Sequence, residues 1–301
     1  MSLRGTVTDA VAETGFGVGW SAVRALPEPA ARRMFDVIAD RTWARQGQGV
    51  RQLRANVARV LPAHELDRLD EVAHEGVRRY MRYWCEVFRL PSYSRQEILD
   101  AFHIDGREHM DAYLRQGRGV IMAVPHMGNW DLAAGWAALE YDSVVTVVEH
   151  LKPEGLFEKF LEFRRSLGME VYPLGDPDIV RNLARRLETG SLVCLLTDRD
   201  LSGSGIEVSF FGERATFPAG PGMLSLMTGA PVIPAGIWHT DSGLQARVDT
   251  PLFAPEEGGR RERVAALTRD MAANFERHIA AHPQDWHMMQ PFWSVDRGEA
   301  R

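Results

Sequence analysis

VPHMGNWD, residues Val124 to Asp131, joins a predicted strand to a predicted helix. The preceding residues 119–124 are apolar and rich in β-branched side chains, which is typical of a short buried strand. Pro125 ends this strand because proline cannot donate to a sheet ladder. Asn129 is a suitable N-cap for the apolar segment 130–139, which therefore predicts a helix. The turn between them is expected at the carboxyl end of a sheet, where open α/β folds bind ligands.

Two side chains of this turn, His126 and Asp131, are expected to form a catalytic pair. On one continuous helix, five residues rotate by about 500°, so the two side chains would point roughly 140° apart. His126 precedes the helix, however, and side chains in a first turn lean toward the helix N-terminus, which aims Asp131 at the imidazole. A carboxylate on one ring nitrogen would leave the other free to take a proton from a hydroxyl group. The spacing alone is not specific, since His103 and Glu108 repeat it.

The wider sequence resembles a known family. The turn matches the H-x4-D/E block of lysophospholipid acyltransferase-like enzymes, and specifically of the bacterial lipid A lauroyl/myristoyl acyltransferases. Within that family the chain is most similar to actinobacterial phosphatidylinositol mannoside acyltransferases. Phe217 departs from the family pattern, which carries threonine there. The other matching blocks follow in order at residues 52–57, 168–172, 210–215 and 220–234.

The resemblance implies a membrane-associated enzyme that moves a fatty acyl group, palmitoyl, from acyl-CoA to the 6-hydroxyl of a mannose of phosphatidylinositol mannoside. Acyl-CoA would be a co-substrate, and no cofactor is expected. The reaction needs a base, donors for an oxyanion and an apolar channel, but neither a metal nor a covalent serine. Two alternatives stay open. The same chemistry could serve a lysophospholipid or a lipid A-like sugar, or the chain could be a non-enzymatic peripheral lipid-binding protein whose turn is only structural.

Further polar residues follow other predicted strands and helices. Glu149 comes directly after one strand, Asp198, Arg199 and Asp200 come after another, and Arg164 lies late in a helix. Because parallel strands end at one edge of a sheet, the residues that follow the two strands are expected near His126. The resemblance implies a catalytic role for Asp200 and substrate-binding roles for Glu149 and Arg164. Asp198 and Arg199 are expected to form a salt bridge with each other.

The element pattern predicts an α/β fold with a mainly parallel central sheet and helices on both faces, preceded by an N-terminal helical segment. We expect one domain, residues 1–301, with a mostly helical part at 1–116 and an α/β core at 117–301. Residues 243–248 are expected as an antiparallel edge strand. The predicted helices are 6–26, 30–45, 50–60, 65–88, 130–139, 153–167, 176–188 and 260–282, and the predicted strands are 119–124, 143–148, 169–172 and 191–197.

Composition limits the location and the partners. No segment reaches the roughly 18 apolar residues of a membrane span, and the start does not resemble a signal peptide, so we expect neither a transmembrane nor an exported protein. Together with the membrane association that the resemblance implies, this favours peripheral attachment to the cytoplasmic face of the plasma membrane. Residues 1–62 carry a net charge of +4 in a chain of −6, which would favour an anionic inner-membrane surface. The segment 6–26 is expected either to pack on the domain or to lie at the interface. Cys85 and Cys194 lie in apolar segments and are expected as free thiols.

Other function classes lack their motifs. The acidic balance and the absence of a basic stripe disfavour nucleic acid as a partner. The sequence contains no G-x-S-x-G, G-x-G-x-x-G or Walker A motif, which disfavours serine-nucleophile and nucleotide chemistry. His278, His282 and His287 have a spacing that suits zinc, but the accompanying acid of an H-E-x-x-H motif is missing. We therefore expect them to be surface or packing residues and predict no metal site.

Overall fold

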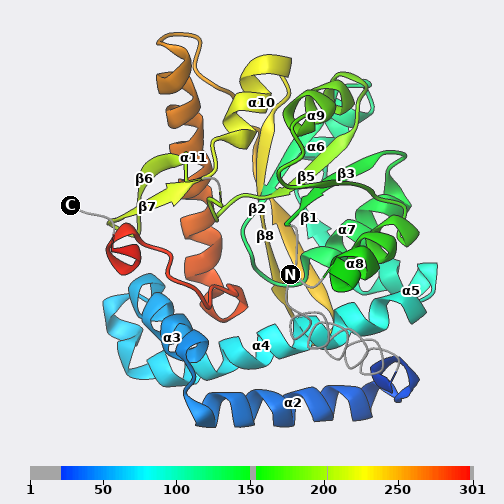
Figure 1. Ribbon diagram of the computed structural model, residues 1–301, viewed down its shortest axis with the longest axis vertical. Helices are drawn as coiled ribbons and strands as arrows, with labels where there is room; N and C mark the ends of the chain where they lie inside the picture. The colour runs from blue at the N-terminus through cyan, green and yellow to red at the C-terminus, as the bar shows by residue number, and fades with distance from the viewer. Residues whose placement is uncertain (1–21, 150–153, 202, 299–301) are drawn as a thin grey trace, which may run out of the picture.

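A seven-stranded sheet forms the centre of the computed structural model (Figure 1). The model describes residues 22–149, 154–201 and 203–298. The strand order is β1-β9-β8-β2-β5-β3-β4, and β8 and β9 are the antiparallel neighbours in an otherwise parallel sheet. The mainly parallel α/β fold predicted from the sequence is thus confirmed. The strands are β1 Phe102–Asp105, β2 Val120–Val124, β3 Val144–Val148, β4 Glu170–Pro173, β5 Leu192–Leu196, β8 Val232–His239 and β9 Leu244–Val248.

Apolar side chains cover both faces of this sheet. Strand β2 is buried at every position, and its alternate residues enter two different hydrophobic clusters, with Ile121 and Ala123 on one face and Met122 and Val124 on the other. This alternation follows from the two-residue period of a strand and explains why its sequence is apolar throughout. Helices α9 Ile179–Glu188, α10 Gly220–Thr228 and α11 Arg260–Ala281 contribute to the first cluster, and α6 Glu108–Leu114, α7 Trp130–Glu140 and α8 Glu154–Ser166 to the second.

The N-terminal helices stack along one end of the sheet (Figure 1). Helix α4 Leu69–Arg89 is the longest of them, and it packs against α2 Glu28–Arg45 and α3 Gln48–Val60. The first half of α4 forms a small core with α3 through Val72, Ala73 and Val77, whereas Tyr83 and Val87 in its second half join the core of the sheet. Because of this division, α4 connects the N-terminal helices to the α/β core.

The structure differs from the sequence prediction both inside the sheet and at its margins. Strand β8, which lies between β9 and β2, and helices α6 and α10 were not predicted. Strand β1 was not predicted, because it has four residues and presents alternate side chains to solvent. It pairs with β9, so the prediction that residues 243–248 form the edge is wrong. The predicted antiparallel orientation of this strand is confirmed, because it runs antiparallel to β8. The hairpin of β6 Ile206–Phe210 and β7 Glu213–Phe217, a separate two-stranded sheet, and the short helix α5 Arg95–Asp100 were also not predicted.

Two further expectations concern the membrane and the thiols. Within the described ranges, the helices are all too short or too polar to cross a bilayer. Cys85 and Cys194 are free, as predicted. The predicted helix at 6–26 lies almost entirely outside the described residues.

Candidate active site

Strands β2 and β5 bring a histidine and an aspartate together. They are parallel neighbours with Val124 opposite Leu196, so the residues two positions further along, His126 and Asp198, leave the sheet side by side. The Nδ1 atom of His126 donates to Asp198 Oδ1 at 2.5 Å, and the backbone N–H of His126 donates to Asp198 Oδ2 at 2.9 Å. The side chain of Asp198 is fully buried, whereas 18% of the His126 side chain is exposed.

The electrostatics of Asp198 favour its ionised form. Burial alone raises the pKa of this carboxyl group, but the imidazole of His126 and three N–H donors outweigh burial, so the pKa of Asp198 lies below its ordinary value. The third donor is the indole N–H of Trp286, 3.0 Å from Oδ2. An ionised Asp198 can only accept, so the proton of a neutral His126 ring resides on Nδ1. Its Nε2 then carries the lone pair that a general base requires.

Asp131 turns away from His126 and forms a buried ion pair with Arg164. The guanidinium donates to both carboxylate oxygens, at 2.7 and 3.2 Å, and the hydroxyl of Tyr83 donates at 2.9 Å. The predicted contact between Asp131 and His126 is therefore wrong. Trp130, the first residue of α7, takes the position beside the imidazole, with ring centroids 5.4 Å apart. Asp131, one residue later, faces α4 and α8 instead.

The salt bridge predicted between Asp198 and Arg199 is also wrong, because the donors to Asp198 are His126 and Trp286. Arg199 instead lines the cavity that contains His126. Asp200 is turned toward the following loop, where its carboxylate accepts the backbone N–H of Gly205 at 2.9 Å. Asp198 is thus the acid of this loop that meets the histidine.

A cavity of about 240 Å³ opens at His126. Glu149, predicted near the histidine, and Arg164, expected to bind substrate, line it. Its walls are otherwise mainly aromatic on the side of α4 and α7, with Tyr80, Tyr83, Trp84 and Trp130. The cavity therefore combines a candidate base and charged groups with flat apolar surfaces.

A second cavity of about 90 Å³ lies between the sheet and α7 and is almost entirely apolar. The two cavities share Trp130, Val147, Arg164 and Leu196 in their linings. The Asp131–Arg164 pair thus lies where the polar and the apolar cavity adjoin. Burial alone lowers the pKa of Arg164, but the adjacent Asp131 raises it above the ordinary value, so the guanidinium stays charged.

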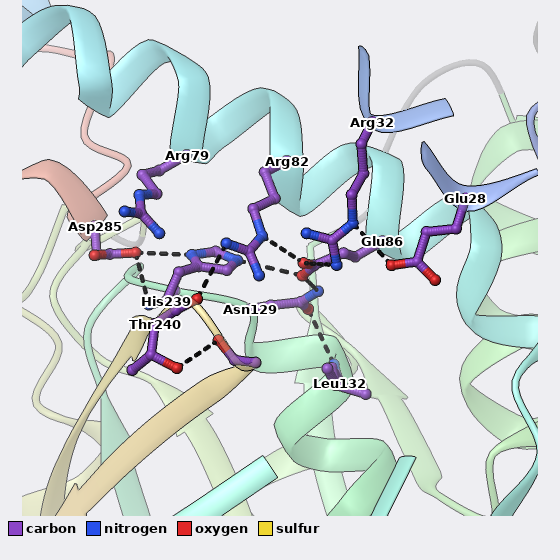
Figure 2. Close-up of polar contacts among 12 residues, drawn as sticks. Glu28, Arg32, Arg79, Arg82, Glu86, Asn129, Leu132, His239, Thr240 and Asp285 are labelled. Carbon is purple, nitrogen blue, oxygen red and sulfur yellow. Dashed lines mark hydrogen bonds and ion pairs between the residues drawn. The ribbon is translucent and has the colours of Figure 1, made fainter. Parts of the chain in front are cut away.

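A network of buried charges supports the back of the turn (Figure 2). Glu86 of α4 accepts from the side chain of Asn129 at 2.9 Å and from Arg82 at 2.8 Å. His239 at the end of β8 lies between two carboxylates, with Nε2 3.2 Å from Glu86 and Nδ1 2.8 Å from Asp285. Burial lowers the pKa of His239, but the two carboxylates outweigh it, so its pKa is raised and the ring donates to both. Asn129 in turn caps helix α7, as the sequence predicted.

The segment Asp285–His287 holds the turn from the C-terminal side. The carbonyl of Asp285 accepts the backbone N–H of Gly128 at 2.9 Å, and the backbone N–H of His287 donates to the carbonyl of His126 at 2.8 Å. The Nε2–H of His287 also donates to the carbonyl of Gly128, at 2.9 Å. His287 is thus a buried structural residue of the candidate site.

Comparison with known proteins gives the family. The model of a family described as bacterial lipid A biosynthesis acyltransferase matches residues 12–294. The chain belongs to this family. It is 42% identical over 303 residues to a phosphatidylinositol mannoside acyltransferase of Mycobacterium tuberculosis strain H37Rv, covering 99% of this chain and 93% of that protein. It is 39% identical over 301 residues to a protein of the same name from Mycolicibacterium smegmatis, covering 99% and 95%.

Among solved structures, the 1-acyl-sn-glycerophosphate acyltransferase PlsC of Thermotoga maritima matches with a TM-score of 0.37 and 14% identity, over 65% of this chain and 82% of that one. This likeness is too slight to bear on the site. Assignment of the chain to the lipid A biosynthesis acyltransferase family rests on the sequence matches.

Gly128, within the family's motif, has a φ of +61°, and a Cβ there would lie 2.6 Å from the carbonyl oxygen of Ile237. We expect Gly128→Ala to reduce the free energy of unfolding by about 2–4 kcal/mol, the sum of left-handed backbone strain and an overpacked contact. Gly229→Ala is the matched control, since φ is +72° there but the space is open. It should cost only about 1 kcal/mol. Equal losses in urea titrations of the two variants would contradict the close approach.

His287 makes stability depend on pH. Burial lowers the pKa of its ring from 6.5 to about 4. The contribution of the neutral His287 ring to the free energy of unfolding is complete above pH 6.5. As the pH falls from 6.5 toward 4, His287 binds a proton in the unfolded chain but not in the folded protein. The free energy of unfolding should therefore fall by roughly 1.4 kcal/mol per pH unit from this group. In His287→Gln, which keeps a donor for Gly128, urea titrations between pH 6.5 and 5 should show a shallower slope by that amount. His103→Gln removes an exposed histidine and serves as the control, and the prediction fails if both variants keep the wild-type slope.

Proposed function

We propose that this protein transfers a fatty acyl group from acyl-CoA to a hydroxyl group of a phosphatidylinositol mannoside, with His126 as general base and Asp198 as its orienting acid. The observation that carries the proposal is the buried carboxylate on Nδ1 of His126 beside a cavity that adjoins an apolar one. The relatives named phosphatidylinositol mannoside acyltransferases support the acceptor. Acyl-CoA as donor, palmitoyl as the acyl group and the 6-hydroxyl of mannose as the acceptor position are parts of the same proposal.

In this mechanism Nε2 of His126 takes the proton of the acceptor hydroxyl as the oxygen attacks the thioester carbonyl. Asp198 stabilises the imidazolium that forms, in the manner of a catalytic triad without its nucleophile. When the tetrahedral intermediate collapses, the carbon–sulfur bond breaks and the imidazolium returns the proton to the leaving thiolate. No covalent acyl-enzyme is needed, because the acceptor hydroxyl is itself the nucleophile.

Glu149, Arg164 and Arg199 line the same cavity and supply charge for binding polar parts of the two substrates. Arg164 donates two hydrogen bonds to Asp131, so its main role is to stabilise the region where the two cavities adjoin. The aromatic side chains of Tyr80 and Trp130 offer flat faces suited to the apolar faces of sugar rings.

The acceptor is a membrane lipid, so the enzyme would act at the cytoplasmic surface of the plasma membrane as a peripheral protein. The net positive charge of residues 1–62 supports contact with an anionic leaflet. Tight association of the purified protein with vesicles of anionic phospholipid, weakened by salt, is the behaviour this location requires.

Replacement of Asp198 tests the pair. Asp198→Asn keeps the shape but removes the charge that fixes the proton on Nδ1, so transfer of radiolabelled palmitate from its CoA ester to phosphatidylinositol mannoside should fall by about 10²-fold or more. Asp200→Asn is the matched control two residues away and should stay within about threefold of wild type, since the carboxylate of Asp200 accepts the backbone N–H of Gly205, a bond that an asparagine side-chain oxygen can keep. The single variant His126→Ala should lose transfer activity at least to the same extent as Asp198→Asn.

Three results would count against the proposal. A large loss in Asp200→Asn together with near wild-type activity in Asp198→Asn, both with wild-type melting temperatures, would identify Asp200 as the catalytic acid. A fully active His126→Ala would favour a non-enzymatic lipid-binding role. Labelling of a lysophospholipid or a lipid A-like sugar in preference to phosphatidylinositol mannoside would change the acceptor.

The apolar cavity is proposed to receive the acyl chain. At about 90 Å³ it accommodates a few methylene groups as it stands, and a long chain would displace flexible lining side chains such as Met110 and Met122. Ala137 of α7 lines it as a small residue. Ala137→Phe should raise the ratio of kcat/KM for decanoyl-CoA to that for palmitoyl-CoA by about tenfold, since a filled pocket rejects extra methylenes at about 1–3 kcal/mol. A ratio unchanged from wild type in a folded variant would exclude this cavity.

A further inference from the structure

Trp286 is a fully buried side chain that contacts the candidate acid directly. Its indole N–H donates to Oδ2 of Asp198 at 3.0 Å. The ring belongs to an aromatic cluster with Phe210, Phe292 and Trp293, at centroid distances of 6.3, 5.1 and 6.0 Å. Tryptophan usually finds a partner for its N–H when buried, and here the partner is a charged group rather than a backbone carbonyl. The contact therefore joins the hydrophobic core to the active site.

The three donors to Asp198 are not equivalent. His126 supplies two of them, its ring Nδ1–H on Oδ1 and its backbone N–H on Oδ2. Those two bonds move with the turn that carries the histidine. The indole of Trp286 comes from the segment after α11 rather than from the histidine itself, so it restrains the rotation of the carboxylate from a second direction. Without it, a buried carboxylate oxygen would lose one of two donors, which is costly in a site closed to water.

Hydrogen bonds from other parts of the chain fix the backbone around Trp286. Trp286 pairs with Met127 in an antiparallel bridge, and its neighbours Asp285 and His287 bond to the backbone of Gly128 and His126. Asp285 is also bound to His239 (Figure 2). A side chain anchored in this way cannot follow the carboxylate if it rotates, so it can determine the orientation of the carboxylate.

We propose that Trp286 is a positioning residue of acyl transfer, whose indole N–H aims Oδ1 of Asp198 at Nδ1 of His126 and so keeps Nε2 as the unprotonated nitrogen. The kinetic consequences rest on the proposed base role of His126, whereas the structural statement does not. Trp286 touches no reacting atom in this proposal and acts through Asp198.

The test compares Trp286→Phe with Trp293→Phe. Both tryptophans are fully buried in the same cluster, and Trp293 donates its indole N–H to the carbonyl of Phe210 at 2.9 Å. Each variant loses an indole N–H and ring volume, so both should lose stability, but only one loses a donor to Asp198. Introduction of benzothienylalanine at position 286, which replaces the N–H by sulfur at nearly constant shape, serves as a second variant should Trp286→Phe not fold.

The first readout is the tautomer of His126, measured by ¹⁵N NMR of ring-labelled protein at mildly alkaline pH and assigned with His126→Gln. Wild type and Trp293→Phe should show one tautomer with the proton on Nδ1. Both replacements of Trp286 should show a mixture of tautomers. A single Nδ1–H tautomer in folded protein lacking the Trp286 donor would overturn the proposal, whatever the activity.

The second readout is kinetic. Loss of the Trp286 donor should lower kcat by about tenfold, with KM for acyl-CoA within about twofold, because orientation of the acid matters in the transition state rather than in binding. In an Asp198→Asn background the same change should have little further effect, since the interaction is already absent. An undiminished effect in that background, or equal losses in Trp293→Phe, would assign Trp286 a merely structural role.

The two proposals fail separately. A changed tautomer in a protein whose wild type transfers no acyl group would leave the positioning of Asp198 intact and reject the proposed function. A wild type that transfers acyl groups through His126, combined with an unchanged tautomer in the Trp286 variants, would do the reverse.

Discussion

Burial of carboxylates around the turn after β2 is the constraint on which the site depends. Asp198, Asp131, Glu86 and Asp285 are all nearly or fully inaccessible to solvent, and a buried charge persists only where donors or opposite charges surround it. Asp198 has His126 and Trp286, and Asp131 has Arg164 and Tyr83. Glu86 and Asp285 share His239. Each acid thus fixes side chains from distant parts of the chain around one short turn.

These partners come from every layer of the fold. Glu86 and Tyr83 belong to α4, Arg164 to α8, His239 to β8, and Trp286 to the segment after α11. If one partner is removed, the other charge stays buried without a partner in surroundings that cannot solvate it. The resulting loss of stability usually exceeds the net contribution of the intact pair. The buried charges therefore favour one conformation of the turn. They fix the position of His126, the candidate base.

Much of the architecture could be predicted from local sequence. Apolar runs such as 119–124 and the three- and four-residue period of α4 depend on neighbours along the chain, so β2, β3, β4 and β5 and most of the long helices were predicted close to their observed bounds. Strand β8, inside the sheet, was not predicted. His126 was located correctly in the turn after β2, Glu149 was correctly expected near it, and Arg164, expected to bind substrate, lines the same cavity. The short edge strand β1 was missed because its four residues carry no comparable pattern.

The partner of His126 was not predictable in the same way. Asp131 is five residues from the histidine and Asp198 is 72, and the choice between them depends on which strand lies beside β2. Once β5 is known to be that neighbour, the pair can be identified, because His126 and Asp198 each follow the paired residues Val124 and Leu196 by two positions. Glu86, His239 and Trp286 are harder still, because their roles follow from the packing of α4 and of the C-terminal segment on the turn.

Helix α4 has a consequence for how such enzymes can diversify. One half of it closes the core of the N-terminal helices, while the other half supplies Tyr83 and Glu86 to the buried charges behind the base. A domain boundary at residue 116 or 117 would separate the helical part from the α/β core in the sequence. In the structure it would divide the hydrophobic core that α4 shares with the sheet. We infer that the helical part cannot be exchanged between relatives as an independent module. Changes in the N-terminal helices must evolve together with the residues that hold the turn after β2.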